Sequence, residues 1–200
     1  MSDEIELKAV IEAPAAVREA LREAGATPVW EGMMEDLRFD REGELEALDE
    51  VLRIRTFRSR SESKPVRVNI AWKGATRRTA EGYKARRELE YLVVGPDSPI
   101  DFLRALGYTA VQAIDRYVEI SSLAGASLRL EWYPRMDVLL EVEGSAESIE
   151  SAVRASKIPR ERFLPDALVE FVSRYERRTR HRAVLALADL GGASPSWASR

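Results

Sequence analysis

The chain has 200 residues, of which 45% are hydrophobic and 32% charged, with a formal net charge of −3. This is enough for one domain with a full core, and the near-neutral charge predicts no strong attraction to nucleic acid or to a membrane. The absence of cysteine excludes thiol nucleophiles, disulfides and thiolate zinc sites, and the single histidine, His181, argues against a His-rich metal centre. Any bound metal would therefore be held by carboxylates, which favours a hard ion such as Mg²⁺ or Mn²⁺. The sequence contains no signal peptide and no apolar stretch of membrane length, so a cytoplasmic protein is expected.

The spacing of hydrophobic residues predicts an alternation of strands and helices. Residues 4–8 alternate with a period of two, which places Glu4, Glu6 and Lys8 on one face of a strand. A helix is predicted to begin at Pro14 and to end before Gly25. Further strands are predicted at residues 36–40, 51–57, 66–73, 84–94, 114–121, 127–133 and 137–143, and further helices at 100–106, 147–155 and 166–190. The composition of residues 191–200 predicts a disordered tail after a single domain at 1–190.

The predicted strands share a charged face that carries both signs. Its acids are Glu4, Glu6, Glu88, Glu90, Glu131, Glu141 and Glu143, and its bases are Lys8, Arg53, Arg55, Lys73, Lys84 and Arg86. An open sheet with these residues in water is one interpretation. We favour the other, in which the sheet closes with its apolar face outward and the charges line a lumen for a highly charged ligand. The predicted fold is α+β, an eight-stranded and mostly antiparallel closed β-barrel, or tunnel, with helices packed outside.

Seven short motifs then occur along the chain in a recognisable order. They are Glu4-x-Glu6-x-Lys8, Leu52-Arg53-Ile54-Arg55, Trp72-Lys73-Gly74, Arg86-x-Glu88-x-Glu90, Leu106-Gly107-Tyr108, Arg116-Tyr117 and Glu141-x-Glu143. In these motifs residues 3–175 resemble the CYTH superfamily, the triphosphate tunnel enzymes. The order of the second half most resembles the class IV adenylate cyclase branch.

Two positions depart from the pattern of that branch. The branch usually has a basic residue two positions before Arg116, where this chain has Ile114. It also has an aspartate ten residues before Glu141, where this chain has Glu131. Restoring the usual ligand length with Glu131→Asp is expected to leave activity unchanged or to raise it. The departures leave the expected fold intact and bear on the substrate.

The resemblance implies a divalent-metal-dependent enzyme that acts on a triphosphate, with Mg²⁺ or Mn²⁺ as its cofactor. Arginine forks and lysine charges suit phosphate oxygens, so the expected triphosphate-binding residues are Lys8, Arg53, Arg55, Lys73, Lys84, Arg86 and Arg116. The metal ligands implied are Glu4, Glu6, Glu131, Glu141 and Glu143. The residues expected to be catalytic are Glu4, Glu6, Lys8, Arg86, Glu88 and Glu90.

The expected reaction is that of a class IV-type adenylate cyclase, which converts ATP to cyclic AMP and pyrophosphate. A triphosphatase acting on inorganic or thiamine triphosphate is the alternative, because Ile114 removes a contact expected in the cyclase branch. A third hypothesis is a non-catalytic nucleotide or polyphosphate binder. The expected partner is the triphosphate substrate, with no nucleic acid and no membrane, and a homodimer is compatible with the resemblance.

Overall fold

The computed structural model of the chain describes residues 4–60, 67–95 and 97–199. It has an α+β architecture with one large antiparallel sheet and several helices. The strands are β1 (Glu4–Ile11), β2 (Thr27–Asp40), β3 (Val51–Ser59), β4 (Arg67–Lys73), β5 (Arg77–Arg78), β6 (Lys84–Arg86), β7 (Glu88–Leu92), β8 (Thr109–Leu123), β9 (Ala126–Trp132) and β10 (Val138–Glu143). Val66, the predicted start of β4, lies outside the described residues.

The helices are mostly short and amphipathic. They are α1 (Pro14–Glu23), α2 (Glu44–Ala47), α3 (Pro99–Ala105), α4 (Ala146–Ala155) and α5 (Leu168–Thr179), with 3₁₀ turns η1 (Arg160–Arg162), η2 (Leu187–Leu190) and η3 (Ser196–Ser199). α5 ends earlier than the predicted 166–190 because Arg180 adopts a left-handed conformation, with φ 62°, that stops the helix. In the part of the chain that the structure describes, no helix is long and apolar enough to cross a membrane.

The prediction of a closed eight-stranded barrel is wrong. Ten strands form a sheet in the order β5-β6-β1-β10-β9-β8-β2-β3-β4-β7, which is not closed. The predicted strand at 84–94 divides at Arg87: β6 pairs with β1, while β7 pairs with β4. The chain thus passes from one end of the sheet to the other within a single residue. Alternation of side chains predicts which face a residue occupies, but it does not predict which strand edges become paired.

Strand β2 is much longer than the predicted 36–40. It pairs with β3 on one side and with β8 on the other, with a register shift between Pro28 and Trp30. Its first half contains Pro28 and Gly32, residues that are unfavourable in a strand interior and that conceal the pattern in the sequence. Gly32 is required here because an added Cβ would overlap the carbonyl oxygen of Arg58 on β3.

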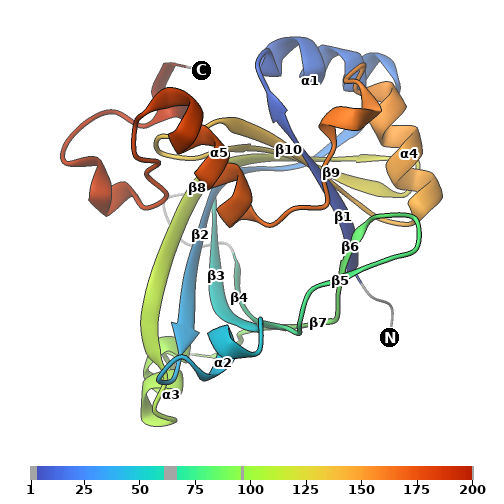
Figure 1. The fold of residues 1–200 in the computed structure, drawn as a ribbon. Coiled ribbons are helices and arrows are strands. Elements are labelled where there is room, and N and C mark those ends of the chain that lie inside the picture. Colours follow the sequence, from blue (N-terminus) through green and yellow to red (C-terminus); the bar gives the residue numbers. More distant parts are fainter. Residues whose placement is uncertain (1–3, 61–66, 96, 200) are drawn as a thin grey trace.

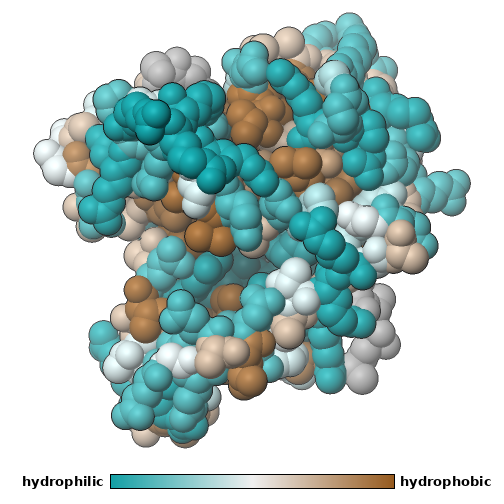
Figure 2. Space-filling model, viewed as in Figure 1, coloured by the Kyte–Doolittle hydropathy of each residue, from teal (hydrophilic) through white to brown (hydrophobic). Residues whose placement is uncertain are grey.

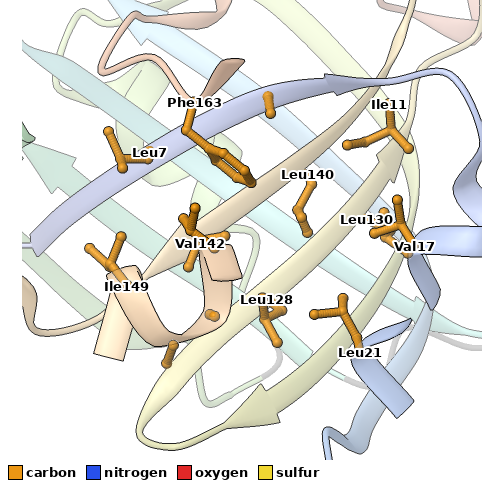
Figure 3. Packing of buried hydrophobic residues seen from close by; sticks show 14 of the residues in the cluster. Leu7, Ile11, Val17, Leu21, Leu128, Leu130, Leu140, Val142, Ile149 and Phe163 are labelled. Atoms are coloured by element: carbon orange, nitrogen blue, oxygen red, sulfur yellow. The ribbon is translucent and has the colours of Figure 1, made fainter. Parts of the chain in front are cut away.

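The main hydrophobic core covers the outer face of β1, β9 and β10. Figure 3 shows Leu7 and Ile11 of β1 and Leu140 and Val142 of β10 packed together beneath helices α1 and α4. Burying apolar area of this extent is the main stabilising contribution in such a domain. Helices on one face leave the other face of the sheet for the charged side chains.

The sheet is strongly bent, so β2, β3, β4 and β8 run across the direction of β1, β9 and β10 (Figure 1). α5 packs on the inner side, where Phe171 contacts a cluster that contains Ile114, Tyr133 and Leu139. Figure 2 shows a hollow between the upper and lower parts of the molecule, with many hydrophilic residues in and around it. The bend therefore places the charged face of the sheet on the concave side.

The segment predicted to be a disordered tail contacts the domain. Ser196 donates its backbone N–H to the carbonyl of Pro134 and its hydroxyl to the carbonyl of Tyr133. Trp197 packs against the main core. These contacts place residues 196 and 197 against the domain.

Candidate functional site

Most of the charged residues predicted to share one face are buried or half-buried on the concave side of the sheet, whereas Glu90 is exposed. The buried members are Glu6, Lys8, Arg53, Arg55, Lys84, Arg86, Glu131 and Glu141, and Asp36 and Arg116 are also buried. Burying an ionised side chain is strongly unfavourable unless it is paired and hydrogen-bonded. We call these residues and their charged neighbours on β1–β10 the charged interior, which consists of two clusters.

The first cluster joins β1, β6 and β10. The Lys8 ammonium lies 2.6 Å from Glu6 and 2.7 Å from Glu141, and the Lys84 ammonium lies 2.6 Å from Glu6. Burial opposes the charge of Lys8, but Glu141 and Glu6 outweigh it and raise the pKa of Lys8. The pKa of Glu141 is held well below its usual value because Lys8 and Arg129 outweigh the effect of burial. Four of the predicted site residues therefore form one ion-paired group.

Arg129 and Glu143 continue this cluster. The Arg129 guanidinium lies 2.7 Å from Glu141 and 2.8 Å from Glu143. Burial raises the pKa of Glu143 to about 7; Arg129 opposes this rise, while the nearby charges of Glu4 and Glu141 add to it. The Glu143 oxygen in this ion pair, Oε2, is buried, and its contact with Arg129 lacks hydrogen-bond geometry. Arg129 therefore joins both carboxylates of the Glu141-x-Glu143 motif to the first cluster.

Lys73 links the two ends of the bent sheet. From β4 its ammonium ion-pairs with Glu4 on β1 and lies 2.9 Å from Glu88 on β7. β1 and β4 are not neighbours in the sheet, so this pair spans the concave side. The predicted residues Glu4, Lys73 and Glu88 are thereby brought together.

The second cluster lies on β2, β3 and β8 and is centred on Asp36. Arg55 donates two hydrogen bonds to its carboxylate, at 2.6 and 2.7 Å, and Arg116 donates two more at 3.2 Å. Arg53 lies 3.6 Å from the same carboxylate. Burial opposes the charge of Asp36, but the three arginines outweigh it and hold the pKa of Asp36 well below its usual value. One acid thus fixes three of the predicted triphosphate-binding arginines.

Glu131 belongs to the second cluster and has its acceptors occupied by protein groups. It accepts hydrogen bonds from Arg116 Nε at 2.9 Å and from the Tyr133 hydroxyl at 2.7 Å, and it is only 2% exposed. The extra methylene, relative to the aspartate of the family pattern, lets one carboxylate reach both partners. Its observed contacts are those of a residue that positions Arg116.

Two of the predicted site residues, Arg86 and Glu90, make contacts outside the two clusters. Arg86 donates its guanidinium N–H groups to the backbone carbonyls of Gly74 and Asp49, at the point where β6 leads into β7. Glu90 is exposed and accepts a hydrogen bond from Asn69. Neither contact joins the residue to the two clusters.

Asp36 and Arg129 are not among the catalytic, triphosphate-binding or metal-binding residues expected from the sequence. Both follow the same alternation as the predicted residues: Arg129 lies two positions before Glu131 on β9, and Asp36 lies opposite Arg55 in the β2–β3 register. The alternation in the sequence could have identified Arg129, because Arg129 lies two positions before Glu131 and therefore on the same face. The partnership of Asp36 with three arginines depends on strand pairing, which the sequence did not predict.

The carboxylates of the first cluster match a divalent ion in their chemistry but not in their present arrangement. Among the described residues no group of three or more acidic side chains is arranged ready to hold a metal. The chemistry nevertheless fits a hard ion, because Glu4, Glu6, Glu141 and Glu143 offer only oxygen, and Glu143 Oε2 accepts no hydrogen bond in its ion pair with Arg129. Lys8 now supplies positive charge between Glu6 and Glu141, where such an ion would also be favoured.

Comparison with solved structures identifies the fold. A Pyrococcus horikoshii protein superimposes with a TM-score of 0.66 and 23% identity, over 86% of this chain and 98% of that one. A Vibrio parahaemolyticus protein provisionally assigned as an adenylate cyclase gives a TM-score of 0.71 with 16% identity, over 86% and 98% of the two chains. This chain has the CYTH, or triphosphate tunnel, fold.

A third protein with the CYTH fold bears on the range of activities. A Hippeastrum protein, provisionally assigned as an adenylyl cyclase and described as having a dominant triphosphatase activity, matches with a TM-score of 0.59 and 15% identity, over 90% of this chain and 97% of that one. No known family profile matches this chain, and no curated protein matches it in sequence. At these identities the CYTH likeness concerns the fold, so the chemistry has to be argued from the side chains.

Proposed function

We propose that the charged interior binds the triphosphate group of a small molecule and catalyses its hydrolysis with the help of Mg²⁺ or Mn²⁺. The observation that carries the proposal is the buried cluster of Arg53, Arg55 and Arg116 facing a cluster of carboxylates and lysines. So many buried charges are a cost to folding that a purely structural role does not explain. A triphosphate and its metal ion are together the kind of ligand that both clusters can accommodate.

The two clusters would have different roles in phosphoryl transfer: the second would bind phosphate and the first would hold the metal ion. Arginine forks on β3 and β8 would bind the phosphate oxygens and stabilise the charge that develops in the transition state. Asp36 and Glu131 hold Arg55 and Arg116 in position before the ligand arrives, so little reorganisation is needed. The ion, held by Glu4, Glu6, Glu141 and Glu143, would neutralise phosphate charge and position the attacking water.

We favour hydrolysis over cyclisation as the reaction because of Ile114. This side chain is 1% exposed and packs in the apolar cluster with Leu139 and Phe171. The position beside Arg116 where the cyclase branch usually has a basic residue is therefore part of an apolar core, and it offers no polar contact to a nucleobase.

Adenylate cyclase is the second candidate. It is favoured by the order of Leu106-Gly107-Tyr108 and Arg116-Tyr117 in the sequence and by the likeness to the Vibrio parahaemolyticus protein. A metal-assisted attack of the ribose 3′ hydroxyl on the α-phosphorus would use the same phosphate-binding residues. The two reactions differ in their products.

Product analysis distinguishes the candidates. The purified protein is incubated with ATP, GTP, thiamine triphosphate or tripolyphosphate, with Mg²⁺, with Mn²⁺ or with a chelator. We expect orthophosphate release that requires the ion and is strongest with tripolyphosphate or thiamine triphosphate. Cyclic AMP and pyrophosphate from ATP would establish the cyclase instead. Tight binding without turnover would establish a non-catalytic binder. The absence of both binding and turnover would overturn the proposal.

A further inference from the structure

One cation of the concave face has no role in the site described so far. Arg38 lies on β2, two residues after Asp36 and on the same face of the strand. It stands directly opposite Arg53 in the β2–β3 register and opposite Gln112 in the β2–β8 register. Arg38 donates a hydrogen bond from Nη1 to the Gln112 side-chain oxygen, at 3.0 Å.

Two arginines directly opposite each other on paired strands repel and destabilise a sheet. Both guanidinium groups also have a buried Nε–H without a hydrogen-bond partner. Arg53 is itself only 8% exposed, so its unpartnered donor cannot be satisfied readily by bulk water. Buried unpartnered donors in a folded protein call for an explanation, and a bound acceptor is one.

The local charge points to an anion. Arg53, Arg55 and Arg116 already share the carboxylates of Asp36, Glu88 and Glu131, and Glu88 is also shared with Lys73. Arg38 has no ion pair of its own among these contacts. Burial lowers the pKa of Arg38 to about 10; Asp36 opposes this effect and Arg53 and Arg116 reinforce it. A ligand anion between Arg38 and Arg53 would remove the repulsion and satisfy both donors.

We propose that Arg38 and Arg53 form a subsite for the terminal phosphate of the substrate. This subsite lies two residues along the strands from Arg55, which binds phosphate together with Arg116. A two-residue step on a strand is about 7 Å, so this subsite extends the row of cations along the interior. The ligand class is a chain of three or more phosphates with an unsubstituted end. Gln112 is a positioning residue that holds the Arg38 guanidinium. The inference rests on the proposed function of the same interior.

The test compares phosphate chains of different length on ion-free protein, by titration calorimetry in the presence of a chelator. The probes are tripolyphosphate and pyrophosphate, and the variants are Arg38→Met and Arg38→Lys. The matched control is Arg58→Met, on the outer face of β3, where Arg58 pairs with Glu35. Arg38→Met is expected to weaken tripolyphosphate binding about 10- to 100-fold, as for a lost charge-assisted hydrogen bond.

Four further results are expected from the subsite. Pyrophosphate affinity changes much less than tripolyphosphate affinity, Arg38→Lys is intermediate, and Arg58→Met binds like the parent protein. The ligand-free Arg38→Met protein unfolds at the same temperature as the parent or a higher one, because the repulsion with Arg53 is removed. A residue with a purely structural role would lower that temperature instead.

Two results would overturn the inference. They are unchanged tripolyphosphate affinity in Arg38→Met, and equal losses for tripolyphosphate and pyrophosphate. Failure of the parent protein to bind tripolyphosphate at all is a different result, which would count against the proposed function itself.

Discussion

At the scale of single residues, Asp36 has the most ion-pair partners in the second cluster. It accepts hydrogen bonds from Arg55 and Arg116 and lies near Arg53. Replacing it with the isosteric amide in Asp36→Asn leaves three buried arginines with one carboxylate fewer. Breaking a buried ion pair in this way costs about 3–5 kcal/mol of folding free energy. Urea unfolding at pH 7 measures the loss.

The loss of stability in Asp36→Asn should depend on pH. The pKa of Asp36 is held below its usual 3.8, so its stabilisation is fully present above that pH and is lost as pH falls through the lower, folded value. The difference between the parent and Asp36→Asn should therefore be constant near neutrality and should shrink in strong acid. Glu35→Gln, one residue away and paired with Arg58 on the exposed face, is the control and should cost under about 1 kcal/mol. Equal effects of the two substitutions at pH 7 would contradict this account.

Glu131→Asp now has a different expected result. From the family pattern alone it was expected to leave activity unchanged or to raise it. In the structure the Glu131 carboxylate reaches both Arg116 and Tyr133, and a shorter arm cannot keep both contacts. We expect a loss of about 1–3 kcal/mol in stability and weaker triphosphate binding, measured by unfolding and by calorimetry. Tyr133→Phe, which removes one of the two donors, should show a smaller loss, and unchanged binding in Glu131→Asp would restore the earlier expectation.

At the scale of elements, the close pairing of β2 and β3 positions the arginines. Gly32 permits that pairing because a side chain there would overlap the Arg58 carbonyl. Gly32→Ala should cost about 3 kcal/mol, at the upper end of typical overpacking effects, because two backbones must separate. Gly43→Asn, at a left-handed position with open space around it, should cost much less. Thermal unfolding of the two variants checks the difference, and a mild effect of Gly32→Ala would mean that the strands can shift apart freely.

At the scale of the whole molecule, a ligand that bridges the two clusters should stabilise the bent sheet. Tripolyphosphate at 100 times its dissociation constant should add about 2.7 kcal/mol to the free energy of unfolding. For a chain of this size that corresponds to a rise of about 5–10 °C in the unfolding temperature. The rise should shrink as salt screens the charges. Calorimetric scans at two salt concentrations measure it, and a rise that is independent of salt would point to a non-electrostatic site.

Much of the candidate site follows from local pattern. A strand places alternate side chains on opposite faces, so the period of two in the sequence was enough to predict that Glu6, Lys8, Arg53, Arg55 and Glu141 share a face. Their mixture of charges favoured a lumen inside a closed barrel; these five residues are buried, but the sheet that carries them is not closed. Helices over the opposite, apolar face followed from the same reasoning.

The sequence by itself therefore determined which side chains face inward, because facing depends only on neighbours along the chain. The tertiary structure alone decided how those side chains are paired, since Asp36 meets Arg116 across 80 residues and Lys73 meets Glu4 across 69. It also decided that 84–94 divides at Arg87 and that the sheet is not closed. Register and edge pairing are set by the competition among all strands for partners, and no local pattern records the outcome of that competition.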